Sequence, residues 1–546
     1  MPSSSRTDSA PSGSPLVEAR LRGVAANPGA PSGVLLRLLD PSARPAWRTL
    51  CEGRALPAEV VEAVLAHPDR AVRGAFARNR YVPPEQRGRL VDDPDALVRA
   101  RLAGGPRPRF GTVEALPPDV LETLMTARDG EHPDGLLTAA EIASELDFSQ
   151  QIPHEFHRRM LHHPNPGLRA KAAGQWLWLT AAQREALLAD PEPAVAEAAR
   201  RHRRHLDPAA MEADLPEQDC HARNLLLINY AVSPAVAQRC LTDGRDLSSL
   251  ARNPHTPREF LTRLARDPDP DVRERVAARA DADPALLAEL ARDPVAAVRT
   301  RALLHPLPRT RPEQRAIDRI IGLPAERVGP VGEMFVEPEP GWYEACASSP
   351  EPVLRRVAAT CSRLPRDVVQ RLAEDPDEDV RHILAYNHPL APPAIVLDAF
   401  LATPGQRPYL LTLARLPRTG LGPLLDHEDP EVRALAAADT GLAGPPVREL
   451  TDPDPRVRRA AAANPLLPLD LLERLLSGPS LPDGSPPASA SVSASTPASI
   501  PAPVSADPAL VEGAAANPAL SAERLHALLD GSGLPTGGSR PVDTDR

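Results

Sequence analysis

Residues 267–294 have the sequence DPDPDVRERVAARADADPALLAELARDP, in which two short apolar faces follow one another. Asp267 is suited to cap a helix, and Pro268 suits the first helical position, where its missing N–H costs nothing. Val272 and Val276 then lie one turn apart on one face of that helix. The stretch therefore predicts a first helix that begins at this Asp-Pro pair and buries its valines.

The second half of the stretch predicts a second helix, because leucines recur at helical spacing. They are Leu286, Leu287 and Leu290, and the pattern returns near the end of the chain at Leu471, Leu472 and Leu475. In other copies the break between the helices is Asn-Pro, at Asn253, Asn464 and Asn517. No window alternates as a half-buried strand does. With about 25 residues per unit, one helix of each pair has room for only a turn or two, or for a 3₁₀ segment.

The start of the stretch, Asp-Pro-x-x-x-Val-Arg, recurs along the chain. Close copies end at Arg99, Arg273, Arg299, Arg381 and Arg458, and looser copies end at Arg73, Arg169, Arg355 and Arg433. Degenerate copies centre on Trp47, Ala222 and Leu247, and DPEPAVA around Val195 lacks the arginine. This self-similarity predicts an all-α solenoid of about thirteen helix-pair repeats of roughly 25 residues each. One pair cannot bury its own leucines and valines, so neighbouring pairs complete a continuous core.

The repeats resemble those of the leucine-rich repeat variant family and, more distantly, HEAT repeats. The resemblance rests on the DPxxxVR starts, the Asn-Pro breaks and second helices of the form P-x-L-L-x-x-L-A, and it covers most of residues 20–476. It implies a right-handed solenoid of alternating α and short helices. The amino-terminal cysteine cluster that holds an iron–sulfur centre in that family has no counterpart here, so we expect no cofactor and no metal.

Composition narrows the function classes. The formal net charge is −10 and the isoelectric point is near 5.9, which argues against a general polyanion binder. The five cysteines are scattered and form no CxxC pair, which favours free thiols in a reducing compartment. Neither a secretory leader pattern nor an apolar run of about 18 residues occurs. We therefore expect a cytoplasmic protein without a membrane segment.

Composition shifts also predict the domain organisation. A repeat array over 15–476 carries insertions at about 105–160 and 306–345, and a Pro/Ser/Ala-rich linker at 477–506 separates it from an isolated repeat-like unit at 507–530. Residues 1–14 and 531–546 are predicted to be disordered tails.

Three groups of side chains are candidates for a site. The repeated arginines form either a cationic stripe for nucleic acid or a ladder that bonds adjacent repeats, and the acidic residues within each motif favour the ladder. The basic cluster Arg200, Arg201, Arg203 and Arg204 is suited to an acidic partner, or simply to a solvated helix end. Trp342 and Tyr343 are suited to anchor a partner, although aromatic residues more often fill cores.

Metal-site and catalytic patterns are weak. His154, His157, His162 and His163 gather near Glu155 without an HExxH motif, and residues 130–141 resemble a calcium loop but lack oxygen ligands at key positions. The sequence therefore predicts a non-catalytic scaffold that binds a protein or peptide. The alternative is a HEAT-like protein that binds nucleic acid or modifies DNA, which the net charge disfavours.

Overall fold

The computed structural model of the chain describes residues 14–106, 114–127, 151–279, 281–304, 338–477 and 507–536, with a few isolated helical positions between them. All regular secondary structure in these residues is helical, which confirms the predicted all-α repeat fold. The chain divides into two compact units. Unit 1 comprises Met1–Ile152 and Pro392–Arg546, and unit 2 comprises Pro153–Ala391.

Unit 1 consists of helix pairs. Its first helices are α1 (Pro15–Ala26), α3 (Trp47–Glu52), α5 (Arg70–Phe76), α7 (Ala96–Gly104), α28 (Arg407–Leu410), α29 (Pro430–Ala437), α30 (Pro455–Ala462) and α32 (Pro508–Ala515). Its second helices are α2 (Ser32–Arg37), α4 (Ala58–Leu65), α6 (Pro84–Gly88), α8 (Pro118–Met125), α27 (Pro393–Ala402), α31 (Leu469–Ser477) and α33 (Ala522–Asp530). The second element is a 3₁₀ turn after α28 and α29, at η4 (Gly422–Asp426) and η5 (Arg448–Thr451), as the short period predicts. Two further 3₁₀ segments are η1 (Pro41–Ala46) and η3 (Pro404–Gln406).

Unit 2 has the same design. Its first helices are α11 (Pro166–Ala172), α13 (Pro193–Arg204), α15 (His221–Asn229), α17 (Leu247–Arg252), α19 (Pro270–Ala277), α21 (Ala296–Leu304), α24 (Pro352–Ala359) and α26 (Glu378–Asn387). Its second helices are α10 (His154–Met160), α12 (Ala181–Leu188), α14 (Pro208–Asp214), α16 (Pro234–Asp243), α18 (Arg258–Leu264), α20 (Pro284–Leu290), α23 (Pro340–Ala347) and α25 (Arg366–Ala373), and η2 (Ala173–Trp178) follows α11.

Where two Asp-Pro pairs follow one another, the first helix of the repeat begins at the second pair, whereas the sequence predicts a start at the first pair. α19 begins at Pro270, and the side chain of Asp269 caps it by accepting the backbone N–H of Asp271 at 2.9 Å. Asp267 instead accepts the N–H of Asp269, so the predicted start at Pro268 is wrong by two residues. The reason is that DPDP holds two candidate caps, and only the later one lies within reach of the first turn.

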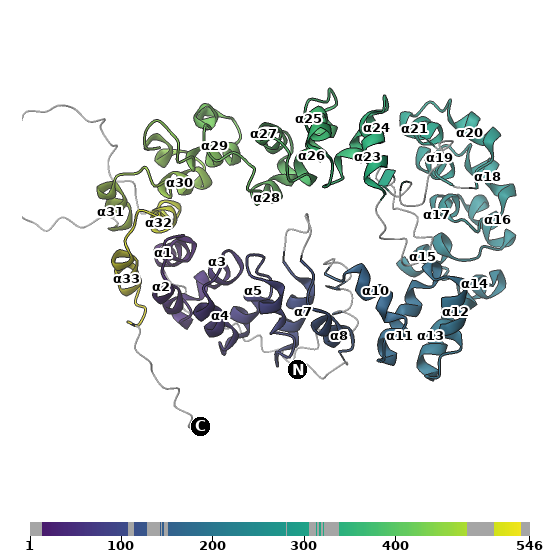
Figure 1. Cartoon of the computed structure of the whole chain (residues 1–546), viewed down its shortest axis with the longest axis horizontal. Helices are drawn as coiled ribbons and strands as arrows, with labels where there is room; N and C mark the ends of the chain where they lie inside the picture. Colours follow the sequence, from purple (N-terminus) through teal and green to yellow (C-terminus); the bar gives the residue numbers. More distant parts are fainter. Residues whose placement is uncertain are drawn as a thin grey trace, which may run out of the picture. The chain divides into compact units, whose positions relative to one another are not determined.

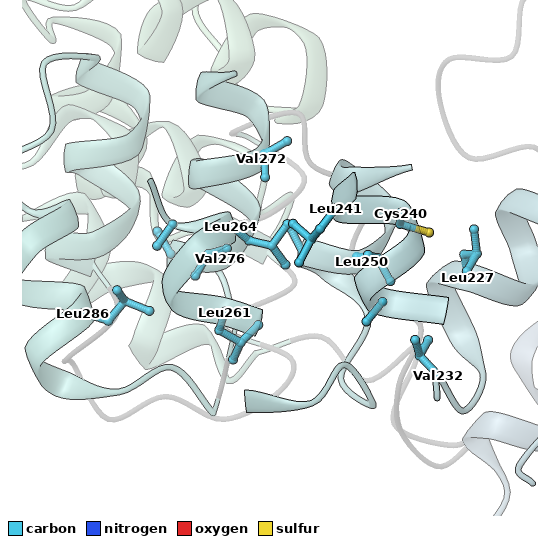
Figure 2. Close-up of a cluster of buried hydrophobic side chains, with 14 of the residues drawn as sticks. Leu227, Val232, Cys240, Leu241, Leu250, Leu261, Leu264, Val272, Val276 and Leu286 are labelled. Carbon is cyan, nitrogen blue, oxygen red and sulfur yellow. The ribbon is translucent and has the colours of Figure 1, made fainter. Parts of the chain in front are cut away.

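The core of unit 2 is assembled from successive repeats. Figure 2 shows Val272 and Val276 of α19 beside Leu261 and Leu264 of α18 and Leu250 of α17, all of them buried in one cluster. Leu286 and Leu290 of α20 belong to the same cluster, as the leucine spacing predicts. Because several helix pairs share one cluster, no pair completes a core by itself.

The helix pair that follows the predicted linker lies between the two ends of the array in unit 1. α32 packs against α30 on one side and against α1 on the other, and α33 packs against α2 (Figure 1). Leu510 and Ala514 of α32 are buried in these contacts. The repeat-like unit predicted at 507–530 therefore packs into the array of unit 1. The repeat pattern identifies a helix pair, but it does not say which neighbours complete the core.

Ordered contacts continue beyond Asp530. Leu534 is buried, and Arg37 of α2 donates to the carbonyl oxygens of Leu534 and Pro535, both at 3.0 Å. The tail predicted to be disordered from 531 is thus bound to α2 at its start. The linker beyond Ser477 and much of the two predicted insertions lie outside the described residues. None of the described helices is both long and apolar enough to cross a membrane.

Candidate functional site

Arginines of the first helices bind aspartates of the next repeat. Arg273 donates from Nε and Nη2 to the carboxylate oxygens of Asp293 at 2.7 and 3.0 Å. Its Nη1 donates to the carbonyl oxygens of Asp267 and Pro268 at 2.8 and 3.0 Å. We call these pairs the Arg ladder. Its further members are Arg73 with Asp93, Arg169 with Asp190, Arg355 with Asp375, Arg433 with Asp452, and Arg458 with Asp507.

The Arg ladder neutralises its own charges. The hydrogen bonds from the arginines hold the pKa values of Asp190, Asp293 and Asp452 below the ordinary range for an aspartate. Paired guanidinium and carboxylate groups of this bidentate kind fix geometry as well as charge. The ladder interpretation is therefore confirmed for these arginines, and they do not form a free cationic stripe.

A second column of side chains joins the carboxyl ends of the first helices. In unit 1, Asn27 donates from Nδ2 to the carbonyl oxygens of Ala515 and Asn517 at 3.1 and 2.7 Å. Asn517 donates in the same way to Ala462 and Asn464 at 3.0 and 2.7 Å. The acceptors are carbonyls at or just past a helix end, where intrahelical partners run out. Each asparagine therefore caps the first helix of a repeat that neighbours it in the stack.

We call this column the spine, and it contains more than asparagines. In unit 1 the side chain of Asn464 donates to the carbonyl of Asp439 at 2.8 Å, that of Arg54 to Asn27 at 2.8 Å, and that of Asn79 to Arg54 at 2.9 Å. In unit 2, Asn253 donates to the carbonyl of Tyr230 at 2.8 Å, and Arg279 donates to that of Asn253.

Sequence analysis identifies the asparagines only as breaks between helices and misses the spine. Arg54 and Arg279 are harder still to find, because a different residue type reaches the same carbonyls with a longer side chain. The available signal is positional: Arg279 follows Val272 at the same distance as Asn464 follows Val457.

Spine asparagines also fix the loops that follow them. Asn464 Oδ1 accepts the N–H of Leu466 at 2.9 Å, and its carbonyl oxygen accepts the N–H of Leu467 at 3.1 Å. Leu467 is buried, whereas Leu466 is 36% exposed. The residue two positions after the spine residue is exposed in each such loop, and we call these residues the loop edge. They are Gly29, Tyr81, His255, Leu466 and Ala519, joined by Leu390, whose N–H is accepted by His388.

The basic cluster predicted from sequence lies in the last turn of α13 and is exposed. Arg200 forms an ion pair with Glu197 at 3.3 Å, and Arg204 binds both carboxylate oxygens of Asp214 at 2.8 and 3.1 Å. Within the described part of the chain, Arg201 and Arg203 have no side-chain hydrogen bond or ion pair. The structure thus brings the four arginines together and leaves two of them available.

The predicted aromatic pair is largely internal. Trp342 and Tyr343 meet edge to face with ring centroids 5.4 Å apart, and Tyr343 is only 2% exposed. Tyr343 is therefore a core residue rather than a partner-binding one, because the helical face that it occupies on α23 points inward. Trp342 is half-buried and keeps some exposed surface.

The histidine group has structural contacts. His157 Nδ1 lies 2.7 Å from Gln175 Nε2, and burial lowers the pKa of His157. His163 Nδ1 accepts the N–H of Asn165 at 3.1 Å. Among the residues that the structure describes, no group of three or more His, Cys, Asp or Glu side chains is placed to hold a metal ion. The calcium-like loop at 130–141 lies outside those residues.

Comparison with known proteins gives one family. No curated protein matches the chain. The leucine rich repeat variant model matches residues 248–269, a segment that includes most of α17, the Asn253 loop and α18. The match contains a spine asparagine and the buried Leu261 and Leu264, which are the features that bind one repeat to the next. The chain thus carries a leucine rich repeat variant repeat within an array of helical pairs, in agreement with the resemblance of its sequence.

Proposed function

We propose that the chain is a non-catalytic scaffold that binds a protein or peptide along its loop edge. The observation that carries the proposal is that the backbone of these loops is held in one conformation, while the exposed side chain differs from loop to loop. The spine holds each loop in one conformation, while the residue presented to solvent changes from Tyr81 to His255 to Leu466. A loop that is already ordered loses little conformational entropy on binding.

The side chains of the loop edge are of the kind that anchor partners. Tyr81 and Leu390 are each 50% exposed, which is unusual for large apolar groups in a scaffold whose other apolar residues are mostly buried. Aromatic residues are over-represented among the few that dominate binding energy at interfaces. The alternative of nucleic-acid binding is not favoured, because the Arg ladder is neutralised by its aspartates.

Photo-crosslinking tests the proposal. Benzoylphenylalanine is placed at Tyr81 or Leu466, and at Arg474 as a control on the exposed side of α31. We expect one protein to be crosslinked from both loop-edge positions and not from the control. The purified partner should then bind the double variant Tyr81→Ser/Leu466→Ser at least about tenfold more weakly than the native chain. Equal crosslinking from Arg474, or unchanged binding of the double variant, would refute the loop edge as the binding surface.

A further inference from the structure

In unit 2, the loop edge is formed by helix instead of a loop at the end of α13. This helix has 12 residues, whereas its neighbours α11 and α15 have 7 and 9. His202 follows Val195 at the distance at which Asn464 follows Val457, so His202 occupies a spine position. The helix continues where other repeats have their loop. Arg203 and Arg204 therefore stand at the two exposed positions that follow a spine residue.

The last turn of α13 presents its arginines on one side. At about 100° per residue, Arg200, Arg201, Arg203 and Arg204 spread over roughly 160° of the helix surface. We call these four residues the arginine fan. His202 falls outside this sector and is half-buried, with Nδ1 2.9 Å from the hydroxyl oxygen of Tyr230. The hydrogen bond to the next repeat holds the turn in place, so the cations project from a fixed base.

Acidic neighbours neutralise only part of the arginine fan. Glu197 engages Arg200 and Asp214 engages Arg204, while Asp207 uses its carboxylate to accept the N–H groups of Ala209 and Ala210 at the start of α14. Arg201 and Arg203 remain exposed and have no partner among the described residues. In the Arg ladder, by contrast, guanidinium groups are bound by carboxylates, as Arg273 is by Asp293.

The loop-edge residue His255 does not extend this positive charge. Burial lowers the pKa of His255, and the charges of Arg279 and Arg184 lower it further. The neutral form of His255 is therefore favoured, and the uncompensated positive charge of this region lies on Arg201 and Arg203. Exposed cations on a fixed edge attract a segment of opposite charge.

We infer that the arginine fan binds a short acidic segment of a protein partner, with carboxylates on Arg201 and Arg203. The inference rests on the proposed scaffold function and names the chemistry of its partner in unit 2. Guanidinium groups bind carboxylates through paired hydrogen bonds. A single-stranded nucleic acid fits less well, because such strands require exposed aromatic rings for stacking. Of the aromatic side chains that the structure describes in the adjacent repeats, Trp176 is buried, and Tyr230 is half-buried with its hydroxyl bound to His202.

The test uses a fluorescein-labelled hexaglutamate peptide and the full-length chain, with anisotropy measured at low ionic strength. We expect binding that weakens with salt, and at least about tenfold weaker binding by the double variant Arg201→Gln/Arg203→Gln. The matched control is Arg266→Gln, an exposed arginine of unit 2 that is paired with Glu289 at 2.8 Å, and it should bind as the native chain does. Unchanged binding by the double variant would overturn the inference.

A single-stranded oligonucleotide separates the two classes of polyanion. Displacement of the peptide by the oligonucleotide at lower concentration than by unlabelled hexaglutamate would also overturn the inference. Loss of peptide binding together with intact crosslinks from Tyr81 and Leu466 would leave the scaffold function standing and remove only the acidic partner. Absent crosslinks would instead contradict the scaffold function itself.

Discussion

The Asn27 side chain lies 2.7 Å from the carbonyl oxygen of Asn517, a bond between the first repeat of the chain and the last one described. In the bond from Asn517 to Asn464, an asparagine side-chain amide again donates to the backbone carbonyl of an asparagine, and the length is again 2.7 Å. The contact of α32 with α1, at the other end of the chain, is thus made by the same kind of hydrogen bond as its contact with α30, across the predicted linker. The carboxy-terminal pair α32 and α33 is an ordinary member of the stack in unit 1.

Charged pairs reinforce the same junction. Glu512 of α32 binds Arg459 of α30 at 2.9 Å and Arg22 of α1 at 3.0 Å. The second helices are joined too, because Arg37 of α2 pairs with Asp530 of α33 at 2.5 Å. We call the contact of α32 and α33 with α1 and α2 the terminal seam.

Removal of the Asn27 amide should loosen the terminal seam. The substitution Asn27→Ala leaves the buried carbonyls of Ala515 and Asn517 without this donor, which costs about 2 kcal/mol. Hydrogen exchange should accelerate in α1 and α32 and stay unchanged in unit 2. Asn387→Ala is the control, since this exposed amide bonds only within its own helix, to Ile383. Equal effects of the two substitutions would show that the spine bond does not hold the seam.

Two glycines permit the close approach of helices around α32. A Cβ on Gly513 would lie 2.2 Å from the carbonyl oxygen of Arg459, and one on Gly23 would lie 2.3 Å from that of Glu512. Backbone must therefore move apart in Gly513→Ala and Gly23→Ala, and we expect each to lower the melting temperature of unit 1. Gly341→Ala in α23 meets nothing within 4 Å and should be neutral or stabilising by up to about 1 kcal/mol.

Loss of a ladder arginine should destabilise more than loss of a surface arginine. Arg433→Met leaves the Asp452 carboxylate largely shielded and unpaired, and we expect a cost of about 2 kcal/mol. Arg474 and Asp470 form a pair that is open to solvent, so Arg474→Met should leave stability unchanged. Thermal unfolding of both variants decides the matter, and similar melting temperatures would argue against a structural ladder.

Much of this scaffold is predictable from sequence because its period is visible in residue types. The DPxxxVR arginines point to a ladder through their acidic neighbours, and Val272, Val276 and Leu290 are core residues as their spacing predicts. The terminal seam is not predictable in this way. Periodicity identifies α32 as a repeat helix but carries no information on its spatial neighbours. Because the predicted linker separates α32 from α30 in sequence, their packing cannot be inferred from the repeat pattern.

The candidate site was less accessible to sequence reasoning. The arginine cluster is visible in the sequence as a run of like charges, but its placement on the loop edge follows only from the spacing of His202 to Val195, which matches that of the spine residues. The exposed residues of the loop edge share no residue type, so only the fixed backbone around them makes them recognisable. Tyr343 shows the reverse case, because an aromatic residue in an aromatic-poor chain attracts attention and yet fills the core.

Acid should weaken the scaffold through the Arg ladder. The pKa values of Asp190, Asp293 and Asp452 are lowered in the folded chain, so their stabilising contribution is complete above the unfolded pKa of about 4. It is lost as the pH falls from there through the lower folded values. The melting temperature should decline below about pH 4, and less steeply in Arg433→Met, which removes the pairing of Asp452. An identical acid slope in that variant would contradict the assignment.

Cleavage of the linker tests the central claim most directly. A protease site is inserted between residues 477 and 506 of the full-length chain, the linker is cut, and the product is analysed by size-exclusion chromatography under native conditions. Because α32 and α33 are bonded on both sides, we predict that the carboxy-terminal fragment co-elutes with the rest of the chain and that Gly513→Ala promotes its release. Complete dissociation of the fragment from the otherwise native chain would contradict the account.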